Sequence, residues 1–171
     1  MEKEQLSLQC IQQYYVAVEN DSAKYMALRD IFSVMNVSKC ILYCNSVRRV
    51  NNLFDQMSSD GFSVVCIHSN INKSERARIF RHFRTGDARI LISSDVTARG
   101  IDIQQVSAVI NVDLTRNVHT YLHRIGRSGR WGRRGIAINL VTKSDVRDLR
   151  NIERWYNIAI HELPSNFNGD V

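Results

Sequence analysis

The sequence has little of what marks fibrous, disordered or membrane-embedded chains. It contains one proline and eight glycines among 171 residues, which excludes collagen-like and low-complexity proteins. Its composition of 44% hydrophobic and 23% charged residues excludes an intrinsically disordered chain. No apolar run approaches the roughly 18–20 residues that span a bilayer, and the polar start lacks the apolar core of a secretory signal. We therefore expect one soluble intracellular domain, cytoplasmic or nuclear, without a membrane partner.

Cysteine pairs of metal-binding or redox type are also missing. The two closest cysteines, Cys40 and Cys44, would lie about 13 Å apart on a strand, too far for a disulfide or a shared zinc ion. His119 and His123 have helical spacing, but no third ligand accompanies them. We predict no metal site, and we expect the four cysteines to be buried thiols in a reducing compartment; they are Cys10, Cys40, Cys44 and Cys66.

Acidic residues are absent from one long stretch. The chain has 23 Lys+Arg and 17 Asp+Glu, yet residues 114–144 contain seven basic residues and no acidic one. All but one of the seven are arginines, which bind phosphates through a bidentate fork. We interpret this stretch as a phosphate-facing surface. The seven are Arg116, Arg124, Arg127, Arg130, Arg133, Arg134 and Lys143.

Known nucleotide loops are missing as well. The sequence has neither G-x-x-x-x-G-K-[ST] nor G-x-G-x-x-G after a strand, and no order of Ser, His and Asp suggests a hydrolase triad. The chain thus has arginines suited to stabilising a phosphoryl group without a loop that would hold the nucleotide.

Short apolar runs alternate with amphipathic segments, which predicts an α/β fold with a mainly parallel sheet. The carboxyl ends of such strands usually form the ligand site, and Asn45, His68, Ser94, Asp95 and Asp113 all fall there. We predict strands at 12–18, 39–44, 62–67, 88–93, 106–112 and 135–141, and helices at 22–35, 47–58, 73–83, 118–125 and 145–156.

Two helices have clear local signals. Asn72, followed by Glu75 three residues later, predicts a capping box at the start of helix 73–83, whose apolar stripe is Ile79, Phe80 and Phe83. In helix 145–156, we predict a core-facing stripe from apolar residues at three-residue spacing; they are Val146, Leu149, Ile152 and Trp155.

The strongest constellation is Y-L-H-R-I-G-R-S-G-R at 121–130. Arg124, Arg127 and Arg130 recur every three residues, and on a helix they share a broad, exposed face. Gly126 and Gly129 allow a close backbone approach beside them. Clustered arginines of this kind stabilise the charge that develops in phosphoryl transfer.

Weaker signals lie where strands end. In I-L-I-S-S-D-V-T-A-R-G-I-D at 90–102, Ser94 can bond a phosphate oxygen and Asp102 can accept from a ribose hydroxyl. Asn45-Ser46 and the segment from His68 to Arg76 each lead into a helix amino terminus, whose free N–H groups suit a nucleic-acid backbone.

These motifs, in this order, resemble the C-terminal RecA-like domain of a DEAD-box RNA helicase. The motifs H-R-I-G-R-S-G-R at 123–130 and S-D-V-T-A-R-G-I-D at 94–102 carry the resemblance, with support from Tyr121, Asn45-Ser46 and F-R-T-G at 83–86. Within the family, L-S-L-Q-C-I-Q-Q-Y-Y at 6–15 and G-R-R-G-I-A-I-N at 132–139 are similar to the group around eukaryotic translation initiation factor 4A.

The resemblance implies a role for each matching residue. The catalytic residues would be Arg127 and Arg130, as fingers on the γ-phosphate of ATP, with His123 and Arg124 lining the cleft toward the attacking water. Asp102 would bind the ATP ribose and Gly100 would pass close to the nucleotide. Arg99 would help to hold the closed state, and the RNA contacts would be Asn45, Arg76, Gly86 and Ser94.

The resemblance also implies what surrounds this chain. Residues 1–8 would be the remnant of an interdomain linker, 9–162 the helicase C-terminal domain, and 163–171 a loosely held tail. An absent N-terminal RecA-like domain would supply the P-loop, the D-E-A-D segment and most ligands of the Mg²⁺ that accompanies ATP. We expect a monomeric RNA helicase that unwinds mRNA and is activated by a helical-repeat scaffold. The alternatives are an exon-junction or mRNA-decay helicase, a DNA-dependent branch, or a stand-alone RNA-binding module.

Overall fold

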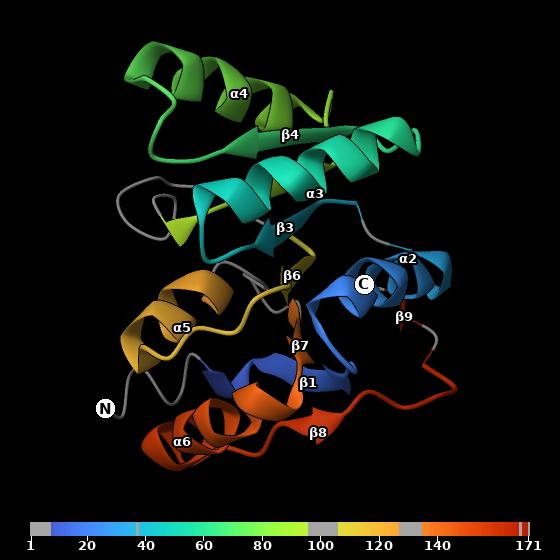
Figure 1. Cartoon of the computed structure of the whole chain (residues 1–171), viewed down its shortest axis with the longest axis vertical. Coiled ribbons are helices and arrows are strands. Elements are labelled where there is room, and N and C mark those ends of the chain that lie inside the picture. The colour runs from blue at the N-terminus through green and yellow to red at the C-terminus, as the bar shows by residue number, and fades with distance from the viewer. Residues whose placement is uncertain (1–7, 37, 96–105, 127–134, 168, 171) are drawn as a thin grey trace.

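A computed structural model describes residues 8–36, 38–95, 106–126, 135–167 and 169–170. A seven-stranded sheet runs through the middle of the molecule with helices on both faces (Figure 1), in the order β4-β5-β3-β6-β7-β1-β8. Every pair of neighbouring strands is parallel, as the sequence predicts. The seven strands are β1 (Ile11–Ala17), β3 (Cys40–Tyr43), β4 (Val64–Ile67), β5 (Ile90–Ser93), β6 (Ala108–Asn111), β7 (Gly135–Val141) and β8 (His161–Glu162).

The predicted helices are confirmed to within a few residues at their ends. They are α2 (Lys24–Val34), α3 (Val47–Ser59), α4 (Lys73–Thr85), α5 (Val118–Ile125) and α6 (Val146–Tyr156). Two short 3₁₀ turns, η1 (Asp21–Ala23) and η3 (Lys143–Asp145), precede α2 and α6. None of the described helices is both long enough and apolar enough to cross a lipid bilayer.

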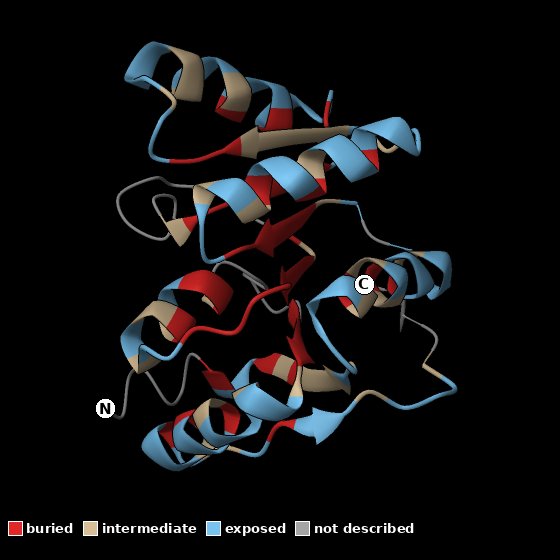
Figure 2. Cartoon of the chain, in the orientation of Figure 1, coloured by how far each residue is buried: buried red, intermediate tan, exposed pale blue. Residues whose placement is uncertain are grey.

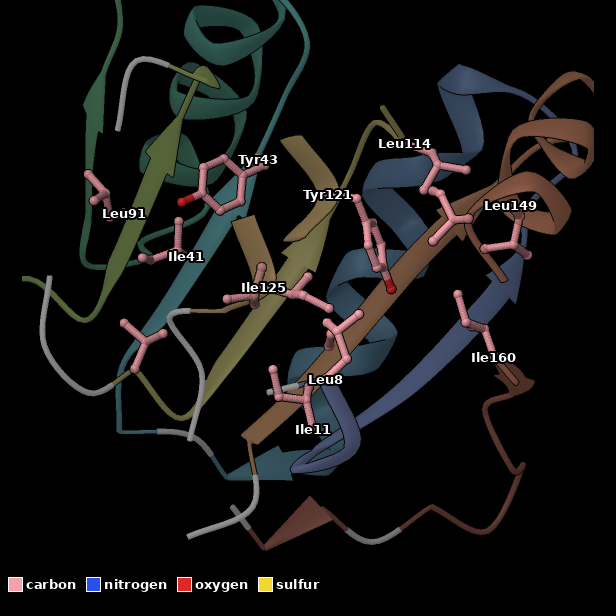
Figure 3. Close-up of a cluster of buried hydrophobic side chains, with 14 of the residues drawn as sticks. Leu8, Ile11, Ile41, Tyr43, Leu91, Leu114, Tyr121, Ile125, Leu149 and Ile160 are labelled. Atoms are coloured by element: carbon pink, nitrogen blue, oxygen red, sulfur yellow. The ribbon is translucent and has the colours of Figure 1, made fainter. Parts of the chain in front are cut away.

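The sheet separates two hydrophobic cores, because successive strand residues point to opposite faces. Ile41 and Tyr43 of β3 belong to the core under α4, α5 and α6, whereas Cys40 and Leu42 belong to the core under α2 and α3. Figure 3 shows the first core, where Tyr121 of α5 lies between the sheet and α6. Burial on both faces explains the nearly continuous apolar runs of the central strands, which are buried throughout (Figure 2).

The cap of α4 forms as the sequence predicts, in part. The Asn72 side chain accepts a hydrogen bond from the backbone N–H of Glu75 at 2.9 Å. The carboxylate of Glu75 bonds to Arg78 in the next turn. Phe80 and Phe83 are buried, which confirms the apolar stripe of this helix.

The predicted stripe on α6 is wrong at both of its ends. Leu149 and Ile152 are buried, but Val146 and Trp155 are 44% and 47% exposed. Tyr156 takes the place of Trp155 in the core and donates a hydrogen bond to the backbone oxygen of Val118. A strict three-residue spacing falls behind the 3.6-residue turn by about 60° per step, so its ends rotate out of the core.

Three further expectations need correction. The segment after residue 162 is not wholly loose, because Leu163 and Phe167 pack on the second core and β9 (Gly169–Asp170) pairs with β2 (Met35–Asn36). Leu8, placed in the linker remnant, is buried in the first core. Of the cysteines, Cys40 and Cys44 are buried as expected, but Cys10 is exposed and Cys66 is half-buried.

Candidate nucleic-acid and nucleotide interface

Four neighbouring strands, β4, β5, β3 and β6, end level with one another. Tyr43 of β3 is paired in register with Ser93 of β5 and Asn111 of β6, and Ile67 of β4 is paired with Ser93. The residues that follow these ends are therefore neighbours at one edge of the sheet. This confirms that the sequence-predicted residues at the strand ends gather there; they are Asn45, His68, Ser94, Asp95 and Asp113.

Arg124, at the end of α5, hydrogen-bonds to several of the residues at this edge. Its Nε and Nη2 donate to the two carboxylate oxygens of Asp95 at 2.6 and 3.0 Å. Nη2 also donates to Oδ1 of Asn45 at 2.6 Å, and Nη1 donates to the backbone oxygen of Asp113 at 2.6 Å. The guanidinium lies 5.3 Å from the ring centroid of Tyr43, close enough for a cation–π contact. One side chain thus ties together the segments that follow β3, β5 and β6.

The burial of Arg124 corrects the sequence interpretation. The side chain is 0% exposed, although the three-residue arginine spacing predicts an exposed face that includes it. His123, the preceding residue, lies on the exposed surface of α5. Arg124 therefore acts from inside the domain, whereas His123 is accessible to a partner.

A second charged group lies beside this clamp. Asp113 accepts from Nζ of Lys24 at 2.8 Å, from Nε of Arg49 at 2.5 Å and from the backbone N–H of Asn45 at 3.0 Å. Asn45 also donates from Nδ2 to the backbone oxygen of Leu114 at 3.1 Å. Asn45 is therefore held by its backbone and by both ends of its side-chain amide.

The electrostatics of this group follow from its pairing. Burial opposes the ionised form of Asp113, but hydrogen bonds from Arg49, Lys24 and the Asn45 backbone outweigh it and lower the pKa of that carboxyl. Burial likewise acts to lower the pKa of Lys24, but its hydrogen bonds and charge contacts with Asp113 and Asp21 raise it overall. Both groups are ionised at neutral pH.

The pairing leaves an edge suited to an anion. The carboxylates of Asp95 and Asp113 are each bound by cations, namely Arg124, Arg49 and Lys24. Neither carboxylate presents an uncompensated negative charge to a phosphate. The three cations neutralise the two carboxylates, so this edge does not repel a phosphate-bearing ligand, such as a nucleic-acid backbone or a nucleotide.

A buried polar ladder extends from the clamp into the sheet. Nη1 of Arg124 also donates to Asn111 at 3.2 Å, Asn111 donates to Asn139 at 2.8 Å, and the Tyr121 hydroxyl donates to Gln13 at 2.6 Å. Asn139 donates to the hydroxyl of Tyr121 at 3.4 Å and so joins the two halves. Burial raises the pKa of Tyr121. This ladder fixes α5 over β1, β6 and β7.

Sequence reasoning missed several members of this network. Asn111 and Asn139 had a signal, because each is a single amide in an otherwise apolar strand, A-V-I-N and G-I-A-I-N-L-V. Lys24 and Arg49 had none, since charged residues at helix starts are ordinary. Only the fold brings them to Asp113.

The predicted RNA contacts divide into two places. Ser94 is buried at the end of β5, and Arg76, whose Nε donates to the backbone oxygen of Ile71 at 2.8 Å, is held in the first turn of α4. Both follow strands that end at the carboxyl edge of the sheet, where Asn45 also lies. Gly86 lies at the opposite end of α4, where its φ of 86° ends the helix in a left-handed conformation.

Several predicted site residues lie outside the described part of the chain. They are Arg99, Gly100, Asp102, Arg127 and Arg130. Of the remaining basic residues in the acid-free stretch, Arg116 is 92% exposed and 3.8 Å from Asp148, and Lys143 is exposed.

Known proteins match this chain over nearly its whole length. Residues 23–132 match the family described as helicase conserved C-terminal domain. The ATP-dependent RNA helicase eIF4A of Eremothecium gossypii is 49% identical over 97% of this chain and 42% of its own length. The ATP-dependent RNA helicase FAL1 of Scheffersomyces stipitis is 46% identical over 98% of this chain and 42% of its own length.

Solved structures agree with these relatives. The C-terminal domain of the DEAD-box protein Dbp5 matches with a TM-score of 0.85 and 33% identity, over 92% of both chains. A DEAD box protein from Methanococcus jannaschii has a TM-score of 0.85 and 32% identity, over 92% of this chain and 43% of its own. The chain spans less than half the length of the curated relatives it matches. With its parallel sheet, this chain belongs to the helicase C-terminal domain family, as a RecA-like domain of the DEAD-box, eIF4A-like group.

Proposed function

We propose that this chain is the C-terminal half of an ATP-dependent DEAD-box RNA helicase of the initiation factor 4A type. In this proposal an N-terminal RecA-like domain binds ATP and Mg²⁺, and this chain closes over the nucleotide and clamps RNA. Hydrolysis of the γ-phosphate of ATP then reopens the clamp. The structure of yeast Dbp5 bound to RNA and ADP BeF3, with a TM-score of 0.85 to this chain, supports the assignment.

The observation that carries the proposal is the Arg124 clamp. It fixes the end of α5, three residues before Arg127, against the strand ends that hold Asn45 and Ser94. The clamp thus ties the helix that leads into the proposed finger segment to the edge that holds the proposed RNA contact. Closure on RNA would therefore position the fingers, which links RNA binding to hydrolysis.

The proposed roles follow the sequence. Arg127 and Arg130 stabilise the γ-phosphate charge, and the exposed His123 faces the partner domain. Asp102 and Gly100 contact the nucleotide and Arg99 holds the two domains together. Asn45, Arg76, Ser94 and Gly86 contact RNA phosphates and sugars, so binding is independent of base sequence. Arg124 is a positioning residue in this scheme.

The partners follow from the same scheme. The proposed protein is a monomer that binds single-stranded or duplex RNA in the cytoplasm or nucleus, and a helical-repeat scaffold holds its two domains. Both eIF4A and FAL1 relatives match this chain, and we propose mRNA unwinding of the eIF4A kind.

The test uses RNA-stimulated ATP hydrolysis. We expect the 171-residue chain alone to be inactive and the protein that joins it to an N-terminal RecA-like domain to be active. In that protein, Arg127→Ala or Arg130→Ala should lower the turnover rate about 10²–10³-fold, the usual effect of losing one charge-stabilising donor.

Arg116→Ala is the matched control, because it removes an exposed arginine of the same stretch. Its turnover should equal that of the unmodified protein. Normal hydrolysis by the Arg127 and Arg130 variants, or hydrolysis by this chain alone, would contradict the proposal.

A further inference from the structure

A second concentration of positive charge lies on α4. The basic residues of 114–144 account for the net positive charge, so the rest of the chain is nearly neutral on average. This average hides a local excess of basic residues. Residues 73–89 contain six basic and two acidic side chains. The basic residues are Lys73, Arg76, Arg78, Arg81, Arg84 and Arg89, and the acidic ones are Glu75 and Asp87.

The fold turns most of this charge outward. Phe80 and Phe83 anchor α4 on the core. Four cations of α4 are exposed, and we name them the α4 arginine face. They are Lys73, Arg78, Arg81 and Arg84. At 100° per residue, Arg78 and Arg81 lie opposite the buried Phe80 and Phe83, and the other two flank them.

The acidic neighbours of this face already have partners within the domain. Glu75 binds Arg78, and Asp87 accepts a hydrogen bond from the hydroxyl of Thr85 at 3.1 Å. Within the described residues, the side chains of Arg81 and Arg84 take part in no hydrogen bond or ion pair. Arginines three residues apart on one helix repel each other, so a stable fold gains nothing from this arrangement.

Helix α6 also carries exposed arginines, but its basic and acidic side chains are nearly equal in number. This contrast makes the charge of α4 unusual. On α6, Arg147, Arg150 and Arg154 alternate with Asp148 and Glu153, and Arg150 pairs with Glu153 at 2.5 Å. Helix α6 thus carries three basic and two acidic side chains, a net charge of +1, whereas α4 carries five and one, a net charge of +4. The larger excess on α4 suits an external anion.

The composition of the face favours RNA over a protein partner. The exposed side of α4 holds small or polar residues between the cations, namely Ser74, Ala77, His82 and Thr85. Protein interfaces need buried apolar or aromatic anchors, whereas nucleic-acid interfaces are polar and positively charged.

The position of α4 extends the proposed RNA path. The helix lies over the edge strand β4, at one end of the molecule (Figure 1). Its first turn holds Arg76 at the carboxyl edge, and its last turn ends at Gly86. Thirteen residues of helix span about 20 Å, long enough to lie beside several successive phosphates of a nucleic-acid strand.

We propose that the α4 arginine face is a second RNA-binding surface, which contacts phosphates of RNA that extends beyond the cleft. The inference rests on the proposed function, because the path begins at the RNA contacts proposed for the carboxyl edge. The surface lengthens the RNA footprint, is independent of base sequence and depends on salt.

The test measures binding of a labelled oligouridylate of about 20 nucleotides to the 171-residue chain by fluorescence anisotropy, over a range of salt concentrations. Arg81→Ala/Arg84→Ala removes two phosphate contacts. The slope of log K against log[salt] should then fall in magnitude by about 1.4, which amounts to about tenfold weaker binding at 0.15 M salt.

Arg147→Ala/Arg154→Ala is the matched control, since it removes the same charge from helix α6. It should leave the slope unchanged. Equal slopes for the two double variants would overturn the proposal. Binding of labelled polyglutamate tests the alternative that the face binds an acidic protein. If Arg81→Ala/Arg84→Ala weakens binding of polyglutamate but not of RNA, the proposal is also overturned.

Asn45→Ala separates this proposal from the proposed function. If Asn45→Ala weakens RNA binding and Arg81→Ala/Arg84→Ala does not, the edge binds RNA and the α4 proposal fails. If the reverse holds, the α4 arginine face binds RNA and the proposed contact at Asn45 fails. Circular dichroism shows that each variant is folded.

Discussion

Two helices of this domain use arginine in opposite ways. On α5, Arg124 is fully buried and binds three segments of the fold, through Asn45, through Asp95, and through Asn111 with Asp113. On α4, Arg81 and Arg84 are exposed. The first helix uses the guanidinium to hold strand ends together, and the second presents it to a ligand.

The difference shows that arginine in a motif has no role by itself. A planar group with five donors can satisfy several acceptors in the interior, or it can bind phosphate at the surface. Which of these occurs depends on the acceptors that the fold gathers around it. Each of the following variants tests one side of this comparison.

The largest effect should come from Arg124→Ala. The change leaves the buried Asn111 and the backbone oxygen of Asp113 without their charged donor, so we expect a loss of about 3–5 kcal/mol in the free energy of unfolding. Urea denaturation of the chain measures this loss.

Arg124→Lys should recover only part of the stability, since an ammonium group cannot reproduce the bidentate contact with Asp95. Arg81→Ala is the control from the exposed helix and should change stability by no more than about 0.5 kcal/mol. Similar losses for Arg124→Ala and Arg81→Ala would remove the distinction between the two helices.

A smaller effect should come from Asp113→Asn, which weakens the ion pairs with Lys24 and Arg49. We expect a loss of about 2 kcal/mol at pH 7. The folded pKa of Asp113 lies below its unfolded value of about 3.9, so the carboxylate stabilises the protein above that pH. This stabilisation disappears as the pH falls through the folded pKa.

The stability difference between the unmodified chain and Asp113→Asn should therefore narrow below about pH 4. Urea midpoints at pH 7, 5 and 3 measure it. Asp30→Asn, which removes an exposed carboxylate of α2, is the matched control at each pH. A difference that stays constant down to pH 3 would mean that the ion pairs contribute little.

The smallest effect should come from the cap of the exposed helix. Asn72→Ala removes the bond to the backbone N–H of Glu75 and should cost about 1 kcal/mol by thermal or urea unfolding. Ser74→Ala, two residues on, is exposed and serves as the control. If the two variants have the same free energy of unfolding, the Asn72 cap does not stabilise the amino end of α4.

Much of the fold could be predicted from the sequence. The central strands are apolar runs because helices cover both of their faces, and α4 was predictable from its cap and its Phe80–Phe83 stripe. The α6 stripe failed because the regular spacing of Val146 and Trp155 differs from the helical period. The buried members are Leu149, Ile152 and Tyr156.

The candidate site was predictable only as a set of strand ends. Asn45, Ser94 and Asp113 each follow an apolar run, and parallel strands bring such ends together. The partners of Arg124 were not predictable, because they come from strands whose order in the sheet differs from their order in the chain.

The sequence alone determined the parallel α/β architecture, the acid-free stretch and the polar residues at the strand ends, because periodicity and local charge are properties of neighbouring residues. The tertiary structure alone decided that Arg124 is enclosed while Arg81 and Arg84 are exposed. Burial of a charged side chain depends on acceptors from distant segments, and only the folded sheet brings Asp95, Asn111 and Asp113 to the same guanidinium.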